Sequence, residues 1–143
     1  MVSVQLFLAS LQGYLWCKAT ASNADLSLNE FFCLIIIDIK RPCCVRKLNE
    51  ELCLHAPATS KILNALEQKG LIDRRLDEHD KRMERVTLTA AGIDRCRRIH
   101  EATEATWNAL SLEVPEERRS AFLECLQQMT RNTALENRAF SIH

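Results

Sequence analysis

One short stretch has the periodicity of a β-strand in a sequence that otherwise has the periodicity of helices. In residues 84–88, Glu-Arg-Val-Thr-Leu, polar and apolar side chains alternate, which places Val86 and Leu88 on one face of a strand. Residues 71–75 begin apolar, and the charged residues 76–83 lie between the two segments. This order is typical of a β-hairpin with a long polar tip. Because the 143 residues include only 3 Gly and 3 Pro, we expect long helices elsewhere.

The region before the hairpin carries the signals of four helices. Residues 3–22 have apolar side chains at spacings of three and four, as an amphipathic helix does. Ser27 and Glu30 have the spacing of a capping box, which predicts the start of a second and largely buried helix. Residues 45–52 fit a short third helix, and residues 53–55 fit a tight turn after it.

The fourth helix is expected between Pro57, which suits a first helical turn, and Gly70, which suits the C-terminal end. Helical geometry gives this segment two faces. The apolar stripe consists of Thr59, Ile62, Leu63 and Leu66, and the opposite face of Pro57, Lys61, Asn64 and Gln68. Two short helices, a tight turn and a following hairpin predict a winged helix-turn-helix.

Two more helices are expected after the hairpin. Thr89 can cap a helix over residues 90–110, and Pro115 opens a last helix. The side chains expected to face inward are Ile93, Cys96, His100, Thr103, Trp107 and Leu110 on the former helix, and Phe122, Cys125, Leu126 and Met129 on the latter. These faces are too long for one small lobe to cover, so the sequence predicts an isologous homodimer.

Charge is unevenly distributed, although the formal net charge of the chain is zero. Residues 40–98 carry a net charge of +5, whereas residues 1–39 carry −2 and residues 99–143 carry −3. A basic middle between acidic flanks is what a local phosphate-binding surface produces. Solvated charges spread at random explain the same numbers about equally well, so charge alone does not decide.

Two phrases in the middle of the chain match a known family. Residues 66–75 read LEQKGLIDRR, and Asp80-Lys81-Arg82 is followed by VTLT at residues 86–89 and by Gly92. At this spacing, and after a helix-turn-helix, the sequence resembles the MarR (multiple antibiotic resistance regulator) family. The resemblance is good over residues 26–92 and rests on pattern alone in the outer helices.

The resemblance implies a mainly α-helical fold with a small β-hairpin wing, as a single domain over residues 1–143. Residues 27–88 would form the winged helix-turn-helix DNA-binding lobe, and residues 1–26 and 89–143 the dimerisation helices. The implied function is that of a cytoplasmic, homodimeric transcription repressor. It would bind a pseudo-palindromic operator in double-stranded DNA and be released by a small aromatic ligand.

The fourth helix supplies the expected contacts with bases. A major groove admits a helix, so the exposed edge that begins at Pro57 would meet base edges there. Ser60, Lys61 and Asn64 are the polar residues so placed. Asparagine can pair with adenine, and lysine with guanine or with phosphate.

The hairpin supplies the other expected contacts. Arg82 at its tip suits the narrow and negative minor groove. Asp80 would be repelled by DNA, so we expect it to orient Arg82 or to pair with Arg74. Arg75 and Lys81 are candidate phosphate contacts. The complete predicted DNA-binding set is Pro57, Ser60, Lys61, Asn64, Arg74, Arg75, Lys81 and Arg82.

Other interpretations of the same residues stay open. The charges of the hairpin could serve only solubility, or the winged helix could contact a protein and have no DNA activity. Tyr14, Trp16, Phe31 and Phe32 could line a ligand site, but core packing is the more frequent role of such residues. His100 is expected to be a polar spot in a helix interface and not a catalytic base.

The seven cysteines raise the alternative of a thiol-based redox sensor. Cys44 is the candidate, because it stands at the expected N-terminus of the third helix, where the helix dipole favours a thiolate. A cysteine in place of a capping hydroxyl is the simpler interpretation. Cys44, His55 and Cys53 are also where this sequence departs from the family, since small capping residues and Gly are usual there.

Several functional classes are not supported by the sequence. There is no Gly-rich phosphate loop, no HExxH and no nucleophile elbow, so we expect no enzyme. No CxxC pair suggests zinc, and no cofactor is expected. The longest apolar run, residues 31–37, is far too short for a membrane span, and no basic segment of a signal peptide precedes the first apolar residues.

Overall fold

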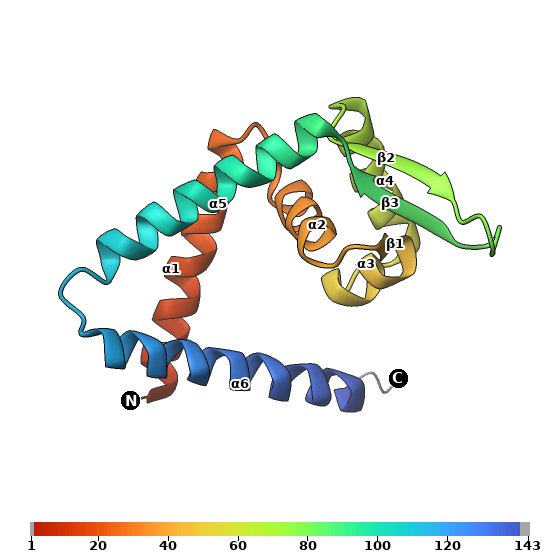
Figure 1. The fold of residues 1–143 in the computed structure, drawn as a ribbon. Coiled ribbons are helices and arrows are strands. Elements are labelled where there is room, and N and C mark those ends of the chain that lie inside the picture. Colours follow the sequence, from red (N-terminus) through yellow and green to blue (C-terminus); the bar gives the residue numbers. More distant parts are fainter. Residues whose placement is uncertain (1, 141–143) are drawn as a thin grey trace. The chain divides into compact units, whose positions relative to one another are not determined.

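The computed structural model describes the backbone of residues 2–140 and the side chains of residues 4, 5 and 7–131. Over residues 2–140 the chain forms six helices and three strands, coloured along the sequence in Figure 1. In order they are α1 (Val2–Asn23), α2 (Leu28–Ile39), β1 (Cys43–Cys44), α3 (Val45–Leu52), α4 (Ala56–Gln68), β2 (Ile72–Leu76), β3 (Glu84–Leu88), α5 (Ala90–Leu110) and α6 (Glu116–Phe140).

The chain divides into two compact units, Met1–Ala102 and Thr103–His143. The first contains α1 to β3 and the beginning of α5, and thus the complete winged helix-turn-helix. The second contains the end of α5 and α6, where Trp107 and Phe122 stack with ring centroids 6.1 Å apart. The expected fold class, mainly α with a small antiparallel sheet, is confirmed.

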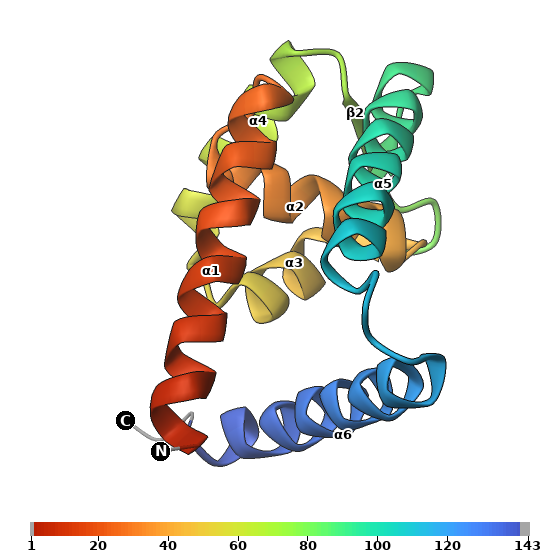
Figure 2. The same ribbon diagram turned by 90° about the vertical axis from the view of Figure 1, so that its left-hand side faces the viewer.

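The core of the first unit lies among α2, α3, α4 and the sheet. Figure 2 shows α2 and α3 side by side in this unit, and both helices contact α4. The largest fully buried side chains here are Leu34, Ile37, Leu48, Leu63, Leu66, Ile72 and Val86. Burying one such side chain contributes about 1.5–3 kcal/mol, so this cluster holds the helix-turn-helix against the sheet.

The capping box expected at the start of α2 is confirmed. Its glutamate also binds a lysine at the end of α4, which the sequence did not indicate. Glu30 N–H donates to Ser27 Oγ at 3.3 Å, and Ser27 N–H donates to Glu30 Oε2 at 2.7 Å. Lys69 Nζ, at the end of α4, donates to the same Glu30 oxygen at 3.0 Å and to the carbonyl of Asp25 at 2.7 Å. The turn between α1 and α2 is therefore tied to the C-terminal end of α4.

The sheet has three strands, whereas the sequence predicted a two-stranded hairpin. The strand order is β1-β3-β2, and both pairings are antiparallel. In the hairpin Ile72 faces Leu88 and Leu76 faces Glu84, and in β1 Cys43 faces Val86. β1 has only two residues, too few for any period to appear in the sequence.

The hairpin is joined to α5 by a tight set of backbone contacts. Thr89 caps α5 as expected, because its Oγ1 accepts the N–H of Gly92 at 3.0 Å. Thr89 N–H donates to the carbonyl of Leu71 at 3.1 Å, and its hydroxyl donates to the carbonyl of Gly70 at 2.6 Å. Gly92 thus lies directly against the backbone at the start of β2.

The apolar faces of the outer helices are more exposed in the single chain than expected. On α5, Cys96 is buried, but Ile93 and Leu110 are exposed, as is His100. The expectation of inward positions on α6 is wrong for a single chain, since Phe122, Cys125, Leu126 and Met129 are all exposed. The helical spacing of these side chains agrees with the helix that the structure shows for α6.

Candidate nucleic-acid interface

The turn between α3 and α4 has the tight geometry that a helix-turn-helix needs. Cys53 ends α3 in the left-handed conformation with φ 51°, which a residue other than Gly adopts at a cost. Cys44 and His55 stand at the N-caps of α3 and α4, and neither forms a side-chain capping hydrogen bond. Pro57 compensates in part, because it lies in the first turn of α4 where its ring favours helical geometry.

α4 has the two faces that the sequence predicted. Thr59, Leu63 and Leu66 are 0% exposed, and Ile62 is 8% exposed, so this stripe anchors the helix in the core. On the other side Pro57, Lys61, Asn64 and Gln68 are exposed, and Ser60 is half-buried. A helix anchored on one side and polar on the other can enter a major groove without disturbing the core.

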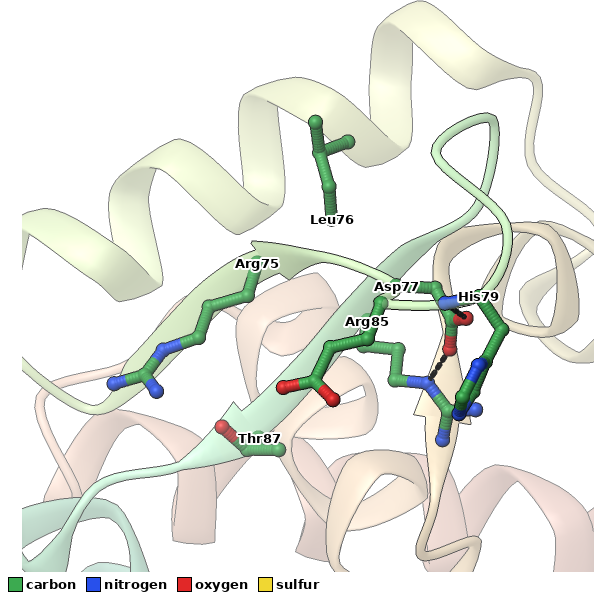
Figure 3. A pocket seen from close by; sticks show the side chains of 7 residues that line it. Arg75, Leu76, Asp77, His79, Arg85 and Thr87 are labelled. Atoms are coloured by element: carbon green, nitrogen blue, oxygen red, sulfur yellow. Dashed lines mark hydrogen bonds and ion pairs between the residues drawn. The ribbon is translucent and has the colours of Figure 1, made fainter.

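The tip of the hairpin is organised by Asp77, a residue that the sequence analysis did not single out. Figure 3 shows its carboxylate between the Arg85 side chain and the backbone of His79. One Asp77 oxygen accepts the backbone N–H groups of His79 at 2.8 Å and Asp80 at 2.9 Å, and the other pairs with Arg85 Nε. The hydrogen bond from Arg85, followed by those from the backbone, lowers the pKa of Asp77 to about 2.

This depressed pKa predicts an acid-sensitive hairpin. Asp77 stabilises the folded state fully above its unfolded-state pKa of about 3.9, and its contribution is lost as the pH falls from there towards 2. We expect Asp77→Asn to reduce stability at pH 6 and to flatten the dependence of the unfolding free energy on pH between these values. Denaturant unfolding followed by circular dichroism checks this, with Glu78→Gln as the control that keeps the slope. If the unfolding free energy of Asp77→Asn depended on pH in the same way as that of the parent, this prediction would be contradicted.

Beyond Asp77, the loop presents two cations at its end. Asp80 Oδ1 accepts the backbone N–H of Arg82 at 3.0 Å, so Asp80 orients the Arg82 main chain. Lys81 and Arg82 are exposed, and among the described residues neither side chain forms an ion pair. These two charges are therefore available to a ligand.

Arg74 lies within β2 and not at the tip of the hairpin. Its partners differ from Asp80 and DNA, the partners expected from the sequence. Its Nε and Nη2 donate to Glu84 Oε1 and Oε2 at 2.7 and 3.0 Å, and its Nη1 donates to Asn64 Oδ1 at 2.6 Å. The Arg74 side chain is only 17% exposed. The hydrogen bonds that Arg74 donates to Glu84 raise the pKa of Arg74 above its ordinary value. Arg74 thus belongs to a contact between the hairpin and α4.

The outer face of the hairpin carries a second arginine that the sequence analysis missed. Arg75 and Arg85 are direct cross-strand partners, and like charges in such positions repel each other. Arg85 is paired with Asp77, while Arg75 is exposed without an ion pair among the described residues. Both line an open cavity of about 410 Å³, with Thr87 and His79 (Figure 3). The register would have revealed this pair, because it puts residues 75 and 85 opposite each other.

The cysteines offer little support for thiol chemistry. All seven are free. Burial raises the pKa of Cys33 to about 12 and that of Cys96 to about 11, so these two remain protonated thiols. Cys44 is half-buried at the N-cap of α3. Among the residues that the structure describes, no group of three His, Cys, Asp or Glu side chains is placed to hold a metal ion, and no helix is long and apolar enough to cross a membrane.

The helix-turn-helix and most of the hairpin coincide with a recognised sequence family. The sequence model of the MarR family matches residues 26–83. Residues 26–83 form a MarR family domain. The resemblance inferred from residues 66–75 and 80–92 is therefore confirmed, and the matched segment contains α2, α3, α4 and β2 completely.

Individual proteins extend the similarity of this MarR domain to the outer helices. The chain is 27% identical over 115 residues to the HTH-type transcriptional regulator BilQ of Clostridium symbiosum, which covers 80% of each chain. A crystal structure of a mutant MepR from a multidrug-resistant S. aureus isolate has a TM-score of 0.79 at 19% identity, covering 93% of this chain and 97% of that one. Another S. aureus MepR mutant, bound to an oligodeoxyribonucleotide, has a TM-score of 0.65 at 19% identity, covering 93% and 98%.

Proposed function

We propose that this chain is a sequence-specific, DNA-binding transcription regulator that acts as a homodimer in the cytoplasm and represses its targets. The observation that carries the proposal is the exposed polar side of α4 next to a hairpin whose Lys81 and Arg82 have no ion-pair partner among the described residues. The MarR domain match and the transcriptional regulator named among the relatives support it.

In the proposed complex, the two faces of α4 have separate roles. The buried stripe fixes the helix, and Ser60, Lys61 and Asn64 on the other side contact base edges in the major groove. Pro57 sets the first turn of the helix at the groove edge. Hydrogen bonds from lysine or asparagine discriminate between bases by about 1–3 kcal/mol when the contact is direct.

The hairpin contributes affinity in the proposed complex. Arg82 enters the adjacent minor groove, where a narrow groove concentrates negative potential. Lys81 and Arg75 contact phosphates, which position the protein and carry no sequence information. The net charge of +5 over residues 40–98 is consistent with this division.

The test is binding of the full chain to duplex DNA from the region upstream of its own gene, measured by gel shift at two salt concentrations. We expect retarded bands that weaken steeply as salt rises, because phosphate contacts release counterions. Absence of binding at low salt would contradict the proposal and favour a winged helix that contacts another protein.

The proposed homodimer accounts for the exposed apolar residues of the outer helices. On α1, Phe7, Leu11 and Leu15 are 67%, 41% and 47% exposed, and they recur at spacings of four. On α6, Phe122 and Leu126 are 50% and 40% exposed at the same spacing. Exposed apolar stripes of this length on a water-soluble protein usually mark a protein interface.

Assembly is expected to depend on the apolar face of α6. We expect the parent chain to have the mass of a dimer in light scattering at micromolar concentration. Leu126→Lys should shift it towards the monomer by at least about tenfold in dissociation constant, because it puts a charge into a buried apolar contact. Gln127→Lys, next to it on the same exposed helix, is the matched control and should remain dimeric. A monomeric parent would rule out the proposed dimer.

We also propose a ligand site for a small aromatic effector. An open cavity of about 410 Å³ lies between the end of α2 and β3, with mostly apolar lining and one arginine. It is lined by Ile37, Arg41, Pro42, Cys43, Val86, Thr87 and Leu88. Its size and the single cation suit a small aromatic acid, and its position beside β3 would let a ligand affect the wing.

A further inference from the structure

Arg74 links the hairpin to the DNA-facing side of α4. Arg74 and Glu84 lie on the same face of the hairpin as the buried Val86, since Arg74 pairs with Val86 and Glu84 with Leu76 in the register. Two N–H groups of Arg74 donate hydrogen bonds to the two carboxylate oxygens of Glu84. This bidentate arrangement fixes the plane of the guanidinium group. A third N–H group of the same guanidinium reaches Asn64 on α4.

This contact determines which way the amide of Asn64 is turned. Arginine has only donors, so the Asn64 atom that faces it must be the carbonyl oxygen and cannot be the NH2 group. The distance of 2.6 Å between Arg74 Nη1 and Asn64 Oδ1 is that of a strong, charge-assisted bond. Asn64 Nδ2 is therefore on the side away from Arg74, on an exposed residue, and it forms no hydrogen bond among the described residues.

An asparagine turned in this way offers a base two donors, while its acceptor oxygen points towards Arg74. A free asparagine amide pairs with adenine by donating to N7 and accepting from the N6 amino group. Here the oxygen needed for the second bond is turned towards Arg74, which occupies one of its two lone pairs. Guanine presents two acceptors, N7 and O6, to the major groove and needs no acceptor from the protein.

We propose that Arg74 and Glu84 are positioning residues that turn the Asn64 amide so that it reads hydrogen-bond acceptors, and guanine in preference to adenine. The inference rests on the proposed DNA-binding function and refines the role of one of its residues. In this arrangement Arg74 acts through Asn64 and makes no phosphate contact of its own, because its charge is neutralised by Glu84.

The experiment is selection of bound sequences from a random duplex library by the full-length protein and its variants. The Asn64→Ala variant is compared with the parent first. The base position at which this variant loses the preference that the parent shows is the position that Asn64 reads. At that position we expect guanine to be enriched by the parent. Glu84→Ala should release Arg74 and the amide, and change the guanine-to-adenine ratio there by about tenfold in favour of adenine, with the other positions unchanged.

Glu78→Ala is the matched control, because it removes the same charge from the same hairpin at an exposed residue. Both glutamate variants should bind all DNA somewhat more tightly, but only Glu84→Ala should change the base preference. Asn64→Asp is the second variant. It keeps an acceptor for Arg74 and removes both donors, so it should lose the guanine preference while its thermal unfolding stays close to that of the parent.

Four results would overturn the inference, and one of them would also overturn the proposed function. An adenine preference of the parent at the Asn64 position, or an unchanged ratio in Glu84→Ala, contradicts the positioning role. If Glu84→Ala does not fold, Asn64→Asp decides, since retained guanine preference in that variant contradicts the donor role. If the parent enriches no sequence, the proposed function fails and this inference fails with it.

Discussion

Gly92→Ala is expected to destabilise the protein by about 3 kcal/mol, the upper part of the usual range for an overpacked site. A Cβ at position 92 would stand far inside van der Waals contact with the carbonyl oxygen of Leu71, and 3.1 Å from its carbonyl carbon. The same Leu71 oxygen accepts the N–H of Thr89, so neither the start of β2 nor the first turn of α5 can move away without losing that bond.

Urea unfolding followed by circular dichroism measures the effect, and Gly13→Ala is the matched control. Gly13 lies in α1, and a Cβ there would have no atom within 4 Å. Alanine is favoured over glycine in a helix by about 1 kcal/mol, so this variant should be at least as stable as the parent. Equal unfolding midpoints for the two variants would contradict the close approach of α5 to β2.

The double variant Lys61→Ala with Arg82→Ala is expected to lose about 100-fold or more in affinity for a selected DNA sequence. Arg82→Ala should weaken binding to all sequences, most of all to those with a narrow minor groove. Lys61→Ala should relax the base preference by about 1–3 kcal/mol at one position. Both side chains are exposed, so the fold should be preserved.

Fluorescence anisotropy with a labelled duplex measures these affinities. Arg118→Ala is the control, because it removes an exposed arginine of α6 that has no ion pair among the described residues. It should bind DNA like the parent. Equal affinities of the double variant and Arg118→Ala at physiological salt would mean that α4 and the hairpin tip do not contact DNA.

The helical part of the fold could be predicted closely because its local signals are strong. The bounds of α3 and α5 agree with the segments expected from periodicity and capping, and the buried stripe of α4 consists of the four residues named in advance. The capping box of α2 was predicted from the spacing of Ser27 and Glu30 alone. In each case the sequence signal that allowed the prediction, a capping spacing or a helical period, repeats within four residues along the chain.

The parts that could not be predicted depend on contacts between distant residues. β1 exists only because Cys43 and Cys44 pair with β3, about forty residues later. The strand register brings Glu84 to Arg74, and the packing of α4 on the hairpin brings Asn64 to the same guanidinium. From the sequence alone these three residues are separate polar positions, so Arg74 was expected to contact DNA directly.

Selection from a random duplex library tests most directly whether this MarR domain reads a specific DNA sequence as a dimer. We predict that the full-length protein enriches an inverted repeat whose half-sites are about one helical turn, roughly 10 bp, apart. A library that emerges without an enriched sequence, while the protein remains folded and soluble, would contradict the account.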